Sequence, residues 1–215
     1  MSQAKRKPYP SKRLFKSDFF ESFSHVHPSV PAIVYLPGVS YLLWKSVDQY
    51  HWGFTALLGF AMVGILFWTL TEYSLHRWVF HLRVPGRLGD RFHELFHGIH
   101  HEQADDPTRL VMPPVVSILL ASAFYLGFES LLGARSATPL FAFFIVGYLG
   151  YDYIHYYVHH FQPKTALGKY LKKNHMLHHY AADEAKWGVS NPLWDLVFNT
   201  HKMPERFTKQ QKAGA

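Results

Sequence analysis

A run of residues without a charged side chain, WGFTALLGFAMVGILFWTLT, occupies positions 52–71. About 20 apolar residues in an α-helix cross the hydrocarbon core of a bilayer, where backbone polar groups must bond within the segment itself. We therefore predict a transmembrane helix here and an all-α integral membrane fold for the chain. The mean hydropathy of −0.08 does not reveal such a fold, because polar segments elsewhere offset the apolar windows.

Three further windows have the composition of a membrane span. They cover residues 30–44, 110–128 and 139–158. The first is the weakest, because Pro37 and Gly38 interrupt it, and in the second Pro113 and Pro114 place the helix start just after them. We predict four transmembrane helices in total.

Basic residues orient these spans and account for the net charge of +7. They precede the first expected span and follow the second: Lys5, Arg6, Lys7, Lys12, Arg13, Lys16, Arg77, Arg83, Arg87 and Arg91. The positive-inside rule then places the N-terminal segment, residues 76–109 and the C-terminal segment on the cytoplasmic side. Because the charge follows membrane topology and forms no nucleic-acid motif, we expect no nucleic acid among the partners.

Histidine is concentrated in four groups that all fall on this one side of the membrane. The groups are His76 and His81; His93, His97, His100 and His101; His155, His159 and His160; and His175, His178 and His179. A surface of imidazoles is a poor core and an unusual solvated face, so metal binding is the natural interpretation. The chain has no cysteine, and any metal must therefore bind to nitrogen or oxygen.

The spacing within the groups suits ligands that project from helices. Residues three or four apart share a helix face, as His155 and His159 do. His76 and His81 are five apart, so we expect their helix to loosen or bend before Pro85. One ion accepts about four to six ligands and the groups supply more, which predicts two ions. Nitrogen ligands suit Fe, Cu, Ni or Zn and do not select among them. A hydrolase needs one metal and one activated water, whereas attack on an unactivated C–H bond of a lipid needs redox chemistry that zinc cannot perform.

Other metal-binding arrangements use these residues less completely. Residues 93–97 read HELFH, the helix motif of zinc metalloproteases with Glu94 as base, but that site would leave most of the histidines without a role. A carboxylate-bridged di-iron bundle requires repeated Glu-x-x-His pairs, and only Glu94 to His97 supplies one. A membrane metal carrier would place ligands along a path within the membrane, whereas these lie at one end.

The motifs HRWVFH, HELFHGIHH, HYYVHH and HMLHH resemble the histidine boxes of the fatty acid hydroxylase superfamily of membrane non-haem di-iron enzymes. The segments EYSLHRWVFH, RLVMPP, GYLGYDYIHYYVHH and NPLWDLVF resemble its fatty acid 2-hydroxylase (sphingolipid α-hydroxylase) branch over about residues 65–200. The resemblance implies four transmembrane helices and a cytoplasmic helical cap that carries a histidine-rich dimetal site. It also implies O₂-dependent hydroxylation at C2 of a fatty acyl chain in ceramide or another sphingolipid. A sterol or carotenoid oxygenase is the alternative within the superfamily.

The resemblance further implies the site residues. The expected ligands of two Fe ions, which zinc could replace in purified protein, are His76, His81, His97, His100, His101, His155, His159, His175, His178 and His179. His93 matches a motif histidine whose role stays open. Tyr148, Tyr151 and Asp152 precede the third box and are expected to contact substrate or to hydrogen-bond near the metals. Anchoring at the membrane interface is the alternative for the two tyrosines.

The expected organisation is a cytoplasmic N-terminal segment at residues 1–29, the hydroxylase domain at 30–205 and a polar tail at 206–215. Yeast and animal members of this branch carry an N-terminal cytochrome b5 domain, for which 29 residues leave no room. We therefore expect a separate electron donor, such as cytochrome b5 or a ferredoxin-type protein, beside the membrane lipid substrate. The active site would face the cytoplasm at the endoplasmic reticulum or a bacterial inner membrane.

Overall fold

The computed structural model describes residues 11–204, and this part of the chain contains helices and loops without a strand. The prediction of an all-α fold is confirmed for these residues. Lys5, Arg6 and Lys7 and the tail expected at 206–215 lie outside the described residues. In chain order the elements are α1 (Asp18–Ser22), α2 (Val30–Asp48), α3 (Phe54–Ser74), η1 (Leu75–Phe80), α4 (Arg87–His93), η2 (Glu94–Gly98), α5 (Ile99–Glu102), α6 (Pro114–His160), α7 (Ala166–Tyr180) and α8 (Leu193–Val197).

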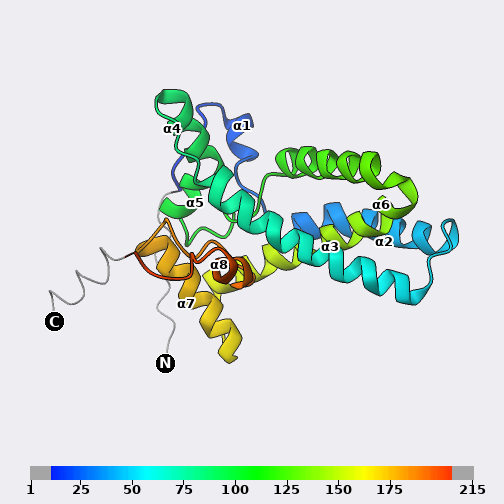
Figure 1. The fold of residues 1–215 in the computed structure, drawn as a ribbon. Helices are drawn as coiled ribbons and strands as arrows, with labels where there is room; N and C mark the ends of the chain where they lie inside the picture. Colours follow the sequence, from blue (N-terminus) through cyan, green and yellow to red (C-terminus); the bar gives the residue numbers. More distant parts are fainter. Residues whose placement is uncertain (1–10, 205–215) are drawn as a thin grey trace.

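Three helices of the described chain are long and apolar enough to cross a bilayer: α2, α3 together with η1, and α6. α6 contains 47 residues but is not one straight rod, because the backbone at Gly133 has φ 70° and ψ 156°. Glycine adopts this conformation without the steric cost of a side chain, and the helix folds back on itself here (Figure 1). From Pro114 onward the expected span at 110–128 therefore falls on the first arm of α6, and the span at 139–158 falls on the second.

α2 runs through Pro37 without a break, so the interruption expected at Pro37 and Gly38 is wrong. Proline removes one backbone donor from a helix and crowds the preceding turn. Membrane helices tolerate this because neighbouring groups satisfy the freed carbonyl. The helix begins at Val30, as the hydropathy predicts, and ends at Asp48, beyond the window that closes at residue 44.

α3 packs against the second arm of α6 at very short range. A Cβ atom on Gly64 would lie 2.8 Å from the Leu140 carbonyl oxygen, and one on Gly147 would lie 2.6 Å from Trp68 Cβ. Small residues allow such close approach of membrane helices. The Trp68 ring also meets the Phe144 ring edge-on at 5.2 Å within the apolar core. Because this packing fixes α3 against α6, it also fixes the ends of both helices, where histidines lie.

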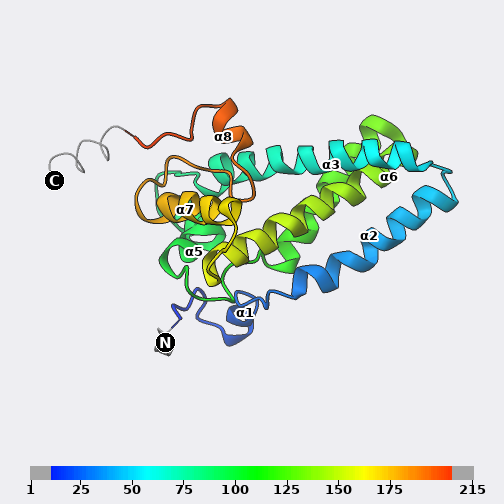
Figure 2. The same ribbon diagram turned by 90° about the horizontal axis from the view of Figure 1, so that it is seen from below.

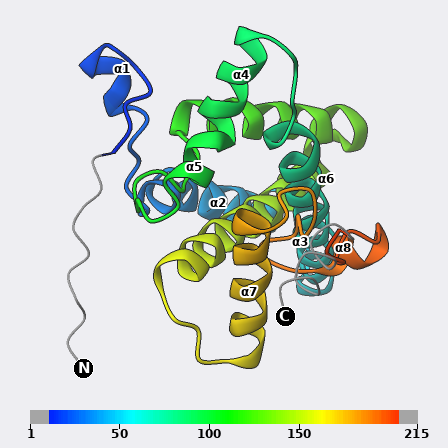
Figure 3. The same ribbon diagram turned by 90° about the vertical axis from the view of Figure 1, so that its left-hand side faces the viewer.

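The short elements gather at one end of the long helices. The end-on view in Figure 3 shows α4, α5 and α7 grouped around the ends of α3 and α6. Seen from below, α7 lies beside α5 and α8 lies against α3 (Figure 2). Segments that are far apart in sequence are thus brought to a single place, and this end of the molecule carries the four histidine groups.

Candidate metal centre

Ten histidines at this end converge in two groups of five. His76, His81, His97, His101 and His178 form one, the His76 group; His100, His155, His159, His175 and His179 form the other, the His155 group. Within each group the potential ligand nitrogens all lie within 4.8 Å of one another. These ten are the residues that the family resemblance implies as ligands. That they bind metal stays a prediction.

Two short helices divide their histidines between the groups. On α5, His101 joins the His76 group and the adjacent His100 joins the His155 group. On α7, His178 joins the first group, whereas His175 and His179 join the second. Successive residues of an α-helix point about 100° apart, so one helix can serve two neighbouring centres. The groups adjoin directly, because the His101 and His179 rings stack at 4.1 Å.

The five-residue spacing of His76 and His81 is explained by a π-helix. η1 continues α3, and the His81 N–H donates to the His76 carbonyl oxygen, five residues earlier, at 3.3 Å. This wider turn brings residues five apart onto one face, and such π-turns are frequent at functional sites. The prediction that the helix loosens before Pro85 is confirmed. A second π-segment, η2, carries His97.

Backbone carbonyls fix the tautomers of two histidines in the His76 group. His76 Nδ1–H donates to the Trp187 carbonyl oxygen at 2.6 Å, and His178 Nδ1–H donates to the Ala185 carbonyl oxygen at 2.8 Å. A neutral imidazole that carries its proton on Nδ1 presents a lone pair at Nε2. Both Nε2 atoms point into the group, where each meets the Nε2 of another histidine at 3.1 Å.

The contacts among the Nε2 atoms fit a metal ion better than a hydrogen-bond network. His97 Nε2 lies 3.1 Å from His76 Nε2 and 2.9 Å from His101 Nε2. One nitrogen carries either a proton or a lone pair, so it cannot serve as acceptor for one neighbour and donor to the other. An ion about 2.0–2.1 Å from each nitrogen would hold neighbouring nitrogens about 3 Å apart. The His155 group repeats these spacings at 2.7–3.1 Å.

Four histidines of the two groups, carried by η2, α5 and α7, are held in their neutral form. Burial, followed by the neighbouring imidazoles, lowers the pKa of His101 to about 3. The same causes lower the pKa values of His97, His100 and His175 well below the ordinary value. A neutral imidazole is the form that binds a metal. The environment thus favours ligands over imidazolium ions.

Two carboxylates that sequence reasoning did not assign hold the loop at residues 185–190 against the His76 group. Glu72 accepts hydrogen bonds from the Val189 N–H at 2.7 Å, from the Ser190 N–H at 2.8 Å and from the Ser190 hydroxyl. Asp195 accepts backbone N–H groups of the same loop. A signal for Glu72 exists in the sequence, since this charge ends an uncharged window one turn before His76.

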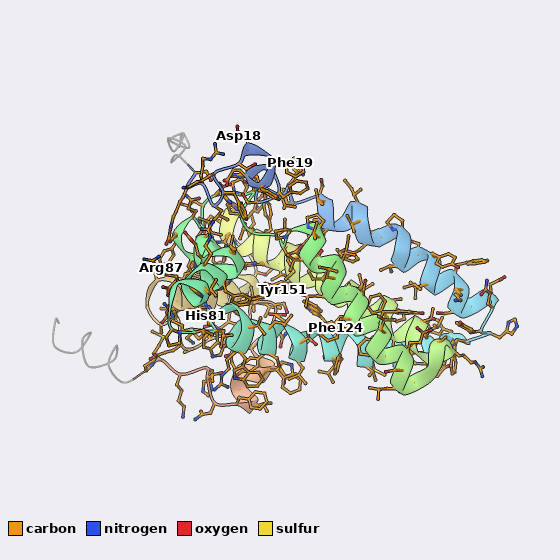
Figure 4. All side chains as sticks on the ribbon, turned by 90° about the horizontal axis from the view of Figure 1, so that it is seen from above. Asp18, Phe19, His81, Arg87, Phe124 and Tyr151 are labelled. Carbon is orange, nitrogen blue, oxygen red and sulfur yellow. The ribbon has the colours of Figure 1, made fainter. Side chains whose placement is uncertain are left out.

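An apolar cavity of about 590 Å³ lies between α1, α3 and the two arms of α6 and reaches both groups. Its lining is mostly aromatic and aliphatic, from Phe19 on α1, Trp68 on α3 and Val116 on α6 among others. His97, His100 and His155 line its polar part. In Figure 4, His81 lies at the histidine end of the molecule, Tyr151 lies inward from it, and Phe124 lies farther along the long helices.

The structure brings Tyr148, Tyr151 and Asp152 to the wall of this apolar cavity. The Tyr151 ring stacks on the His155 ring at 5.6 Å. Tyr148 Oη and Asp152 Oδ2 are buried and have no hydrogen-bond partner among the described residues. An unsatisfied buried polar atom costs free energy unless a ligand satisfies it. The position therefore favours substrate contact over anchoring at the membrane interface.

The metalloprotease arrangement does not form. His93 lies outside both groups, and its Nδ1–H donates to the Phe80 carbonyl oxygen at 3.1 Å. Glu94 faces a polar surface and forms ion pairs with Lys12 at 2.9 Å and with Arg91 at 2.7 Å. His93 and His97 therefore do not converge with Glu94 on one ion.

The remaining histidines also lie outside both groups: His25, His27, His51, His160 and His201. The His160 ring packs on the Tyr156 ring at 4.6 Å, one residue beyond His159 but on a different face of α6. This position outside both groups favours a structural or interfacial role for His160.

Comparison with known proteins gives concordant matches. The family model described as fatty acid hydroxylase matches residues 61–200. The dihydroceramide fatty acyl 2-hydroxylase FAH1 of Arabidopsis thaliana is 36% identical over 93% of this chain and 84% of that protein. The fatty acid 2-hydroxylase of Macaca fascicularis is 36% identical over 90% of this chain and 57% of that protein. A solved structure of full-length scs7p, in which only the hydroxylase domain is visible, matches with a TM-score of 0.81 and 33% identity, covering 86% of this chain and 70% of that one.

The family model covers more than half of the chain, and the histidine motifs within the matched range are the ones that the fold draws together. The chain belongs to the fatty acid hydroxylase family.

Proposed function

We propose that this protein hydroxylates C2 of a fatty acyl chain, with O₂ as co-substrate, in dihydroceramide or a related sphingolipid. The observation that carries the proposal is the apolar cavity whose polar part is formed by histidines of both groups, His97 from one and His100 and His155 from the other. Relatives named for 2-hydroxylation of dihydroceramide acyl chains match along nearly the whole chain. The cavity offers an acyl chain an apolar path that ends beside both proposed centres.

The ten grouped histidines would hold two iron ions as all-nitrogen ligands, a set that zinc could also occupy. Iron held there would supply the redox chemistry by which O₂, reduced by two electrons, oxidises an unactivated C–H bond. Overall, one oxygen atom enters the C2–H bond and the other leaves as water, with two protons and two electrons consumed. The protein's own task is to position C2 and to exclude water around it.

Cavity side chains account for the choice of C2. The acyl chain would lie along Trp68 and Val116, which offer no hydrogen bonds. The Tyr148 hydroxyl could then donate to the acyl carbonyl oxygen, and Asp152 Oδ2 could accept the amide N–H, which satisfies both unpartnered atoms. The carbonyl is thereby held near the histidines, and the carbon attached to it is the one that reaches them.

For the membrane arrangement we propose four spans: α2, α3 with η1, and the two arms of α6 that meet at Gly133. The histidine end would face the cytoplasm, as the Lys and Arg distribution indicates. We propose residues 30–205 as the hydroxylase domain and a separate protein as the electron donor. No step in this arrangement requires a further domain on the same chain.

The test is the 2-hydroxy fatty acid content of hydrolysed lipid, measured by mass spectrometry in cells that express the wild type, His178→Ala or His27→Ala. The His27 side chain is exposed and, among the described residues, hydrogen-bonds locally to Ser29, so its variant is the matched control. The ceramide and glycerolipid fractions are hydrolysed separately, and ¹⁸O₂ marks the source of the hydroxyl oxygen.

We expect labelled 2-hydroxy acids in the ceramide fraction for the wild type and for His27→Ala, and none for His178→Ala. Product in His178→Ala, or an unlabelled hydroxyl, would contradict the proposed centre. Absence of 2-hydroxy acids with all three proteins present, folded and supplied with reductant would reject the proposed function.

A further inference from the structure

The two histidine groups differ in what holds the outer nitrogens of their rings. In the His76 group, His76 and His178 donate from Nδ1 to backbone carbonyls at 2.6 and 2.8 Å. In the His155 group, the Nδ1 atoms of His100, His175 and His179 are buried without a hydrogen-bond partner among the described residues. The orientation and tautomer of a metal-binding imidazole depend on this outer contact. The His76 group therefore has outer hydrogen bonds that fix its rings, and these three rings of the His155 group lack such bonds.

The peptide group that accepts the His76 hydrogen bond is itself hydrogen-bonded to Asp195. Trp187 contributes the carbonyl of this peptide, which accepts the His76 Nδ1–H at 2.6 Å, and Gly188 contributes its N–H, which donates to Asp195 Oδ2 at 2.8 Å. The carboxylate, the peptide and the imidazole thus form one continuous series of hydrogen bonds. The negative charge polarises the carbonyl, which becomes a stronger acceptor for the imidazole proton.

Further contacts prevent this peptide from turning. Asp195 Oδ1 accepts the Trp187 N–H at 2.9 Å and the Thr200 hydroxyl at 2.7 Å, and Asp195 is only 2% exposed. Gly188 is required for the approach, since a Cβ atom there would lie 2.1 Å from the Asn191 carbonyl oxygen and 3.0 Å from Asp195 Oδ2. The Trp187 ring covers the same group, 4.8 Å from the His81 ring. All of these contacts act on the His76 group.

We infer that Asp195 is a positioning residue which, through the Trp187–Gly188 peptide, keeps the proton of His76 on Nδ1 and its lone pair on Nε2. As a result, the His76 group retains its metal ion more strongly than the His155 group does. The inference rests on the proposed dimetal centre and adds that the two sites differ in their affinity for the metal. Losing a comparable outer contact lowers metal affinity by about 10–100-fold, which sets the size of the expected difference.

The test is a chelator titration of the purified full-length protein in detergent, with bound metal per chain measured by inductively coupled plasma mass spectrometry. We expect the wild type to lose its two ions in separate steps, with chelator midpoints at least about tenfold apart. The steps are assigned by removing one ligand from each group. His159→Ala should remove the labile ion, so that the protein keeps only the tightly held ion. His101→Ala should remove the tightly held ion, so that the protein keeps only the labile one.

Asp195→Asn tests the role of the carboxylate. Both Asp195 oxygens accept a backbone N–H, but an amide has only one oxygen, so its NH₂ group must face a donor. We expect the midpoint of the tightly held ion to fall by about tenfold or more, while the midpoint of the labile ion stays unchanged. That unchanged midpoint distinguishes a local effect from unfolding, which would release both ions together.

Two further carboxylate-to-amide variants serve as controls. In Glu72→Gln the amide oxygen can keep both N–H bonds from Val189 and Ser190, and the NH₂ group can donate to the Ser190 hydroxyl, so the tightly held ion should be unaffected. Asp183→Asn changes an exposed carboxylate just before this loop, whose ion pair in the described part of the chain is with Arg83, and it should also have no effect.

The inference is overturned if both wild-type ions leave at one chelator concentration, or if Asp195→Asn shifts neither ion or both equally. It is also overturned if Glu72→Gln reproduces the effect of Asp195→Asn, or if the wild type binds no metal. The last result would remove the dimetal centre as well. If the two ions leave in separate steps but the protein yields no 2-hydroxy lipid, the proposed function is rejected and the difference in metal affinity is still supported.

Discussion

Among the described residues, a polar cavity and an apolar cavity both lie at the histidine end of the molecule. The apolar cavity of about 590 Å³ is lined by α1, α3 and α6 and meets His97, His100 and His155. A polar cavity of about 760 Å³, lined by α4 and the segments before and after it, meets His81, His101 and His179. Each histidine group thus borders both cavities. The histidines form a partition between an apolar side and a charged side.

The difference between the cavities indicates separate routes for the two kinds of reactant. An acyl chain gains by leaving water for the apolar side, where Phe19, Phe20 and Phe23 of the α1 region form part of the wall. Protons, water and reducing equivalents reach the histidines more readily from the charged side. Blocking one cavity should therefore impair lipid binding, and altering the other should impair the supply of electrons and protons.

Filling the apolar cavity should have the largest effect. Val116→Trp places an indole on the cavity wall where the acyl chain would lie, and overpacking or displacement of C2 should lower 2-hydroxy product by about a hundredfold. Metal content should stay at the wild-type level. Ile118→Trp is the matched control, because Ile118 is 45% exposed on the same helix and does not line the cavity. Equal loss of product in both variants would show that bulk on this helix, not cavity filling, is responsible.

Loosening the wall of the apolar cavity should have the next largest effect. Arg109 donates to Glu21 Oε1 at 2.8 Å in a buried ion pair that fixes α1 over the cavity. Arg109→Met leaves the buried Glu21 carboxylate without its cationic partner, which should cost about 3–5 kcal/mol locally and lower product about tenfold. Faster proteolysis at residues 11–24 would report the released segment. Arg13→Met, at an exposed position of the same segment, should change neither quantity.

The same ion pair has a pH signature. Burial raises the pKa of Glu21, but hydrogen bonds from the Phe15 N–H and from Arg109 outweigh this and lower it to about 2. Because the folded pKa lies below the ordinary value of 4.5, the stabilisation is complete above pH 4.5 and is lost as the pH falls towards 2. Glu21→Gln should therefore mimic the acid form at neutral pH.

Changing the charged side should have a smaller effect that depends on the reductant. Arg87 is exposed at the polar cavity, and Arg87→Glu should slow turnover about threefold with a protein electron donor, because surface charges act mainly on association. The loss should grow at low ionic strength and vanish with a small chemical reductant. Lys164→Glu makes the same charge change at an exposed position outside this cavity. A loss that persists with the chemical reductant would place the effect on chemistry and not on docking.

Some features of the histidine layer between the two cavities follow from the sequence, and others depend on the fold. Four-residue spacing predicts that His155 and His159 act together, and the five-residue spacing of His76 and His81 predicts a departure from α-geometry, found as η1. The assignment of His100 to the His155 group could not be read from spacing, because it depends on how α5 is rotated between its neighbours.

Backbone partners were also invisible in the sequence. The Trp187 and Ala185 carbonyls that hold His76 and His178 carry no residue-type signature, since any residue supplies a carbonyl. Hydropathy separates the last two expected spans, but it could not place the chain reversal between them at Gly133. Apolar windows report length and polarity, whereas a single positive φ angle decides where the chain reverses.

The smallest effect is expected at the residue that the HELFH motif would make essential. Glu94 borders the polar cavity but pairs with Lys12 and Arg91, and neither histidine group includes it. Exposed ion pairs of this kind contribute about 0–1 kcal/mol, so Glu94→Gln should change product formation less than about twofold. A zinc metalloprotease would lose its general base and nearly all activity from the same change. Comparing product formation in Glu94→Gln and Val116→Trp therefore tests whether the apolar cavity wall positions the substrate while the charged wall only borders the histidines.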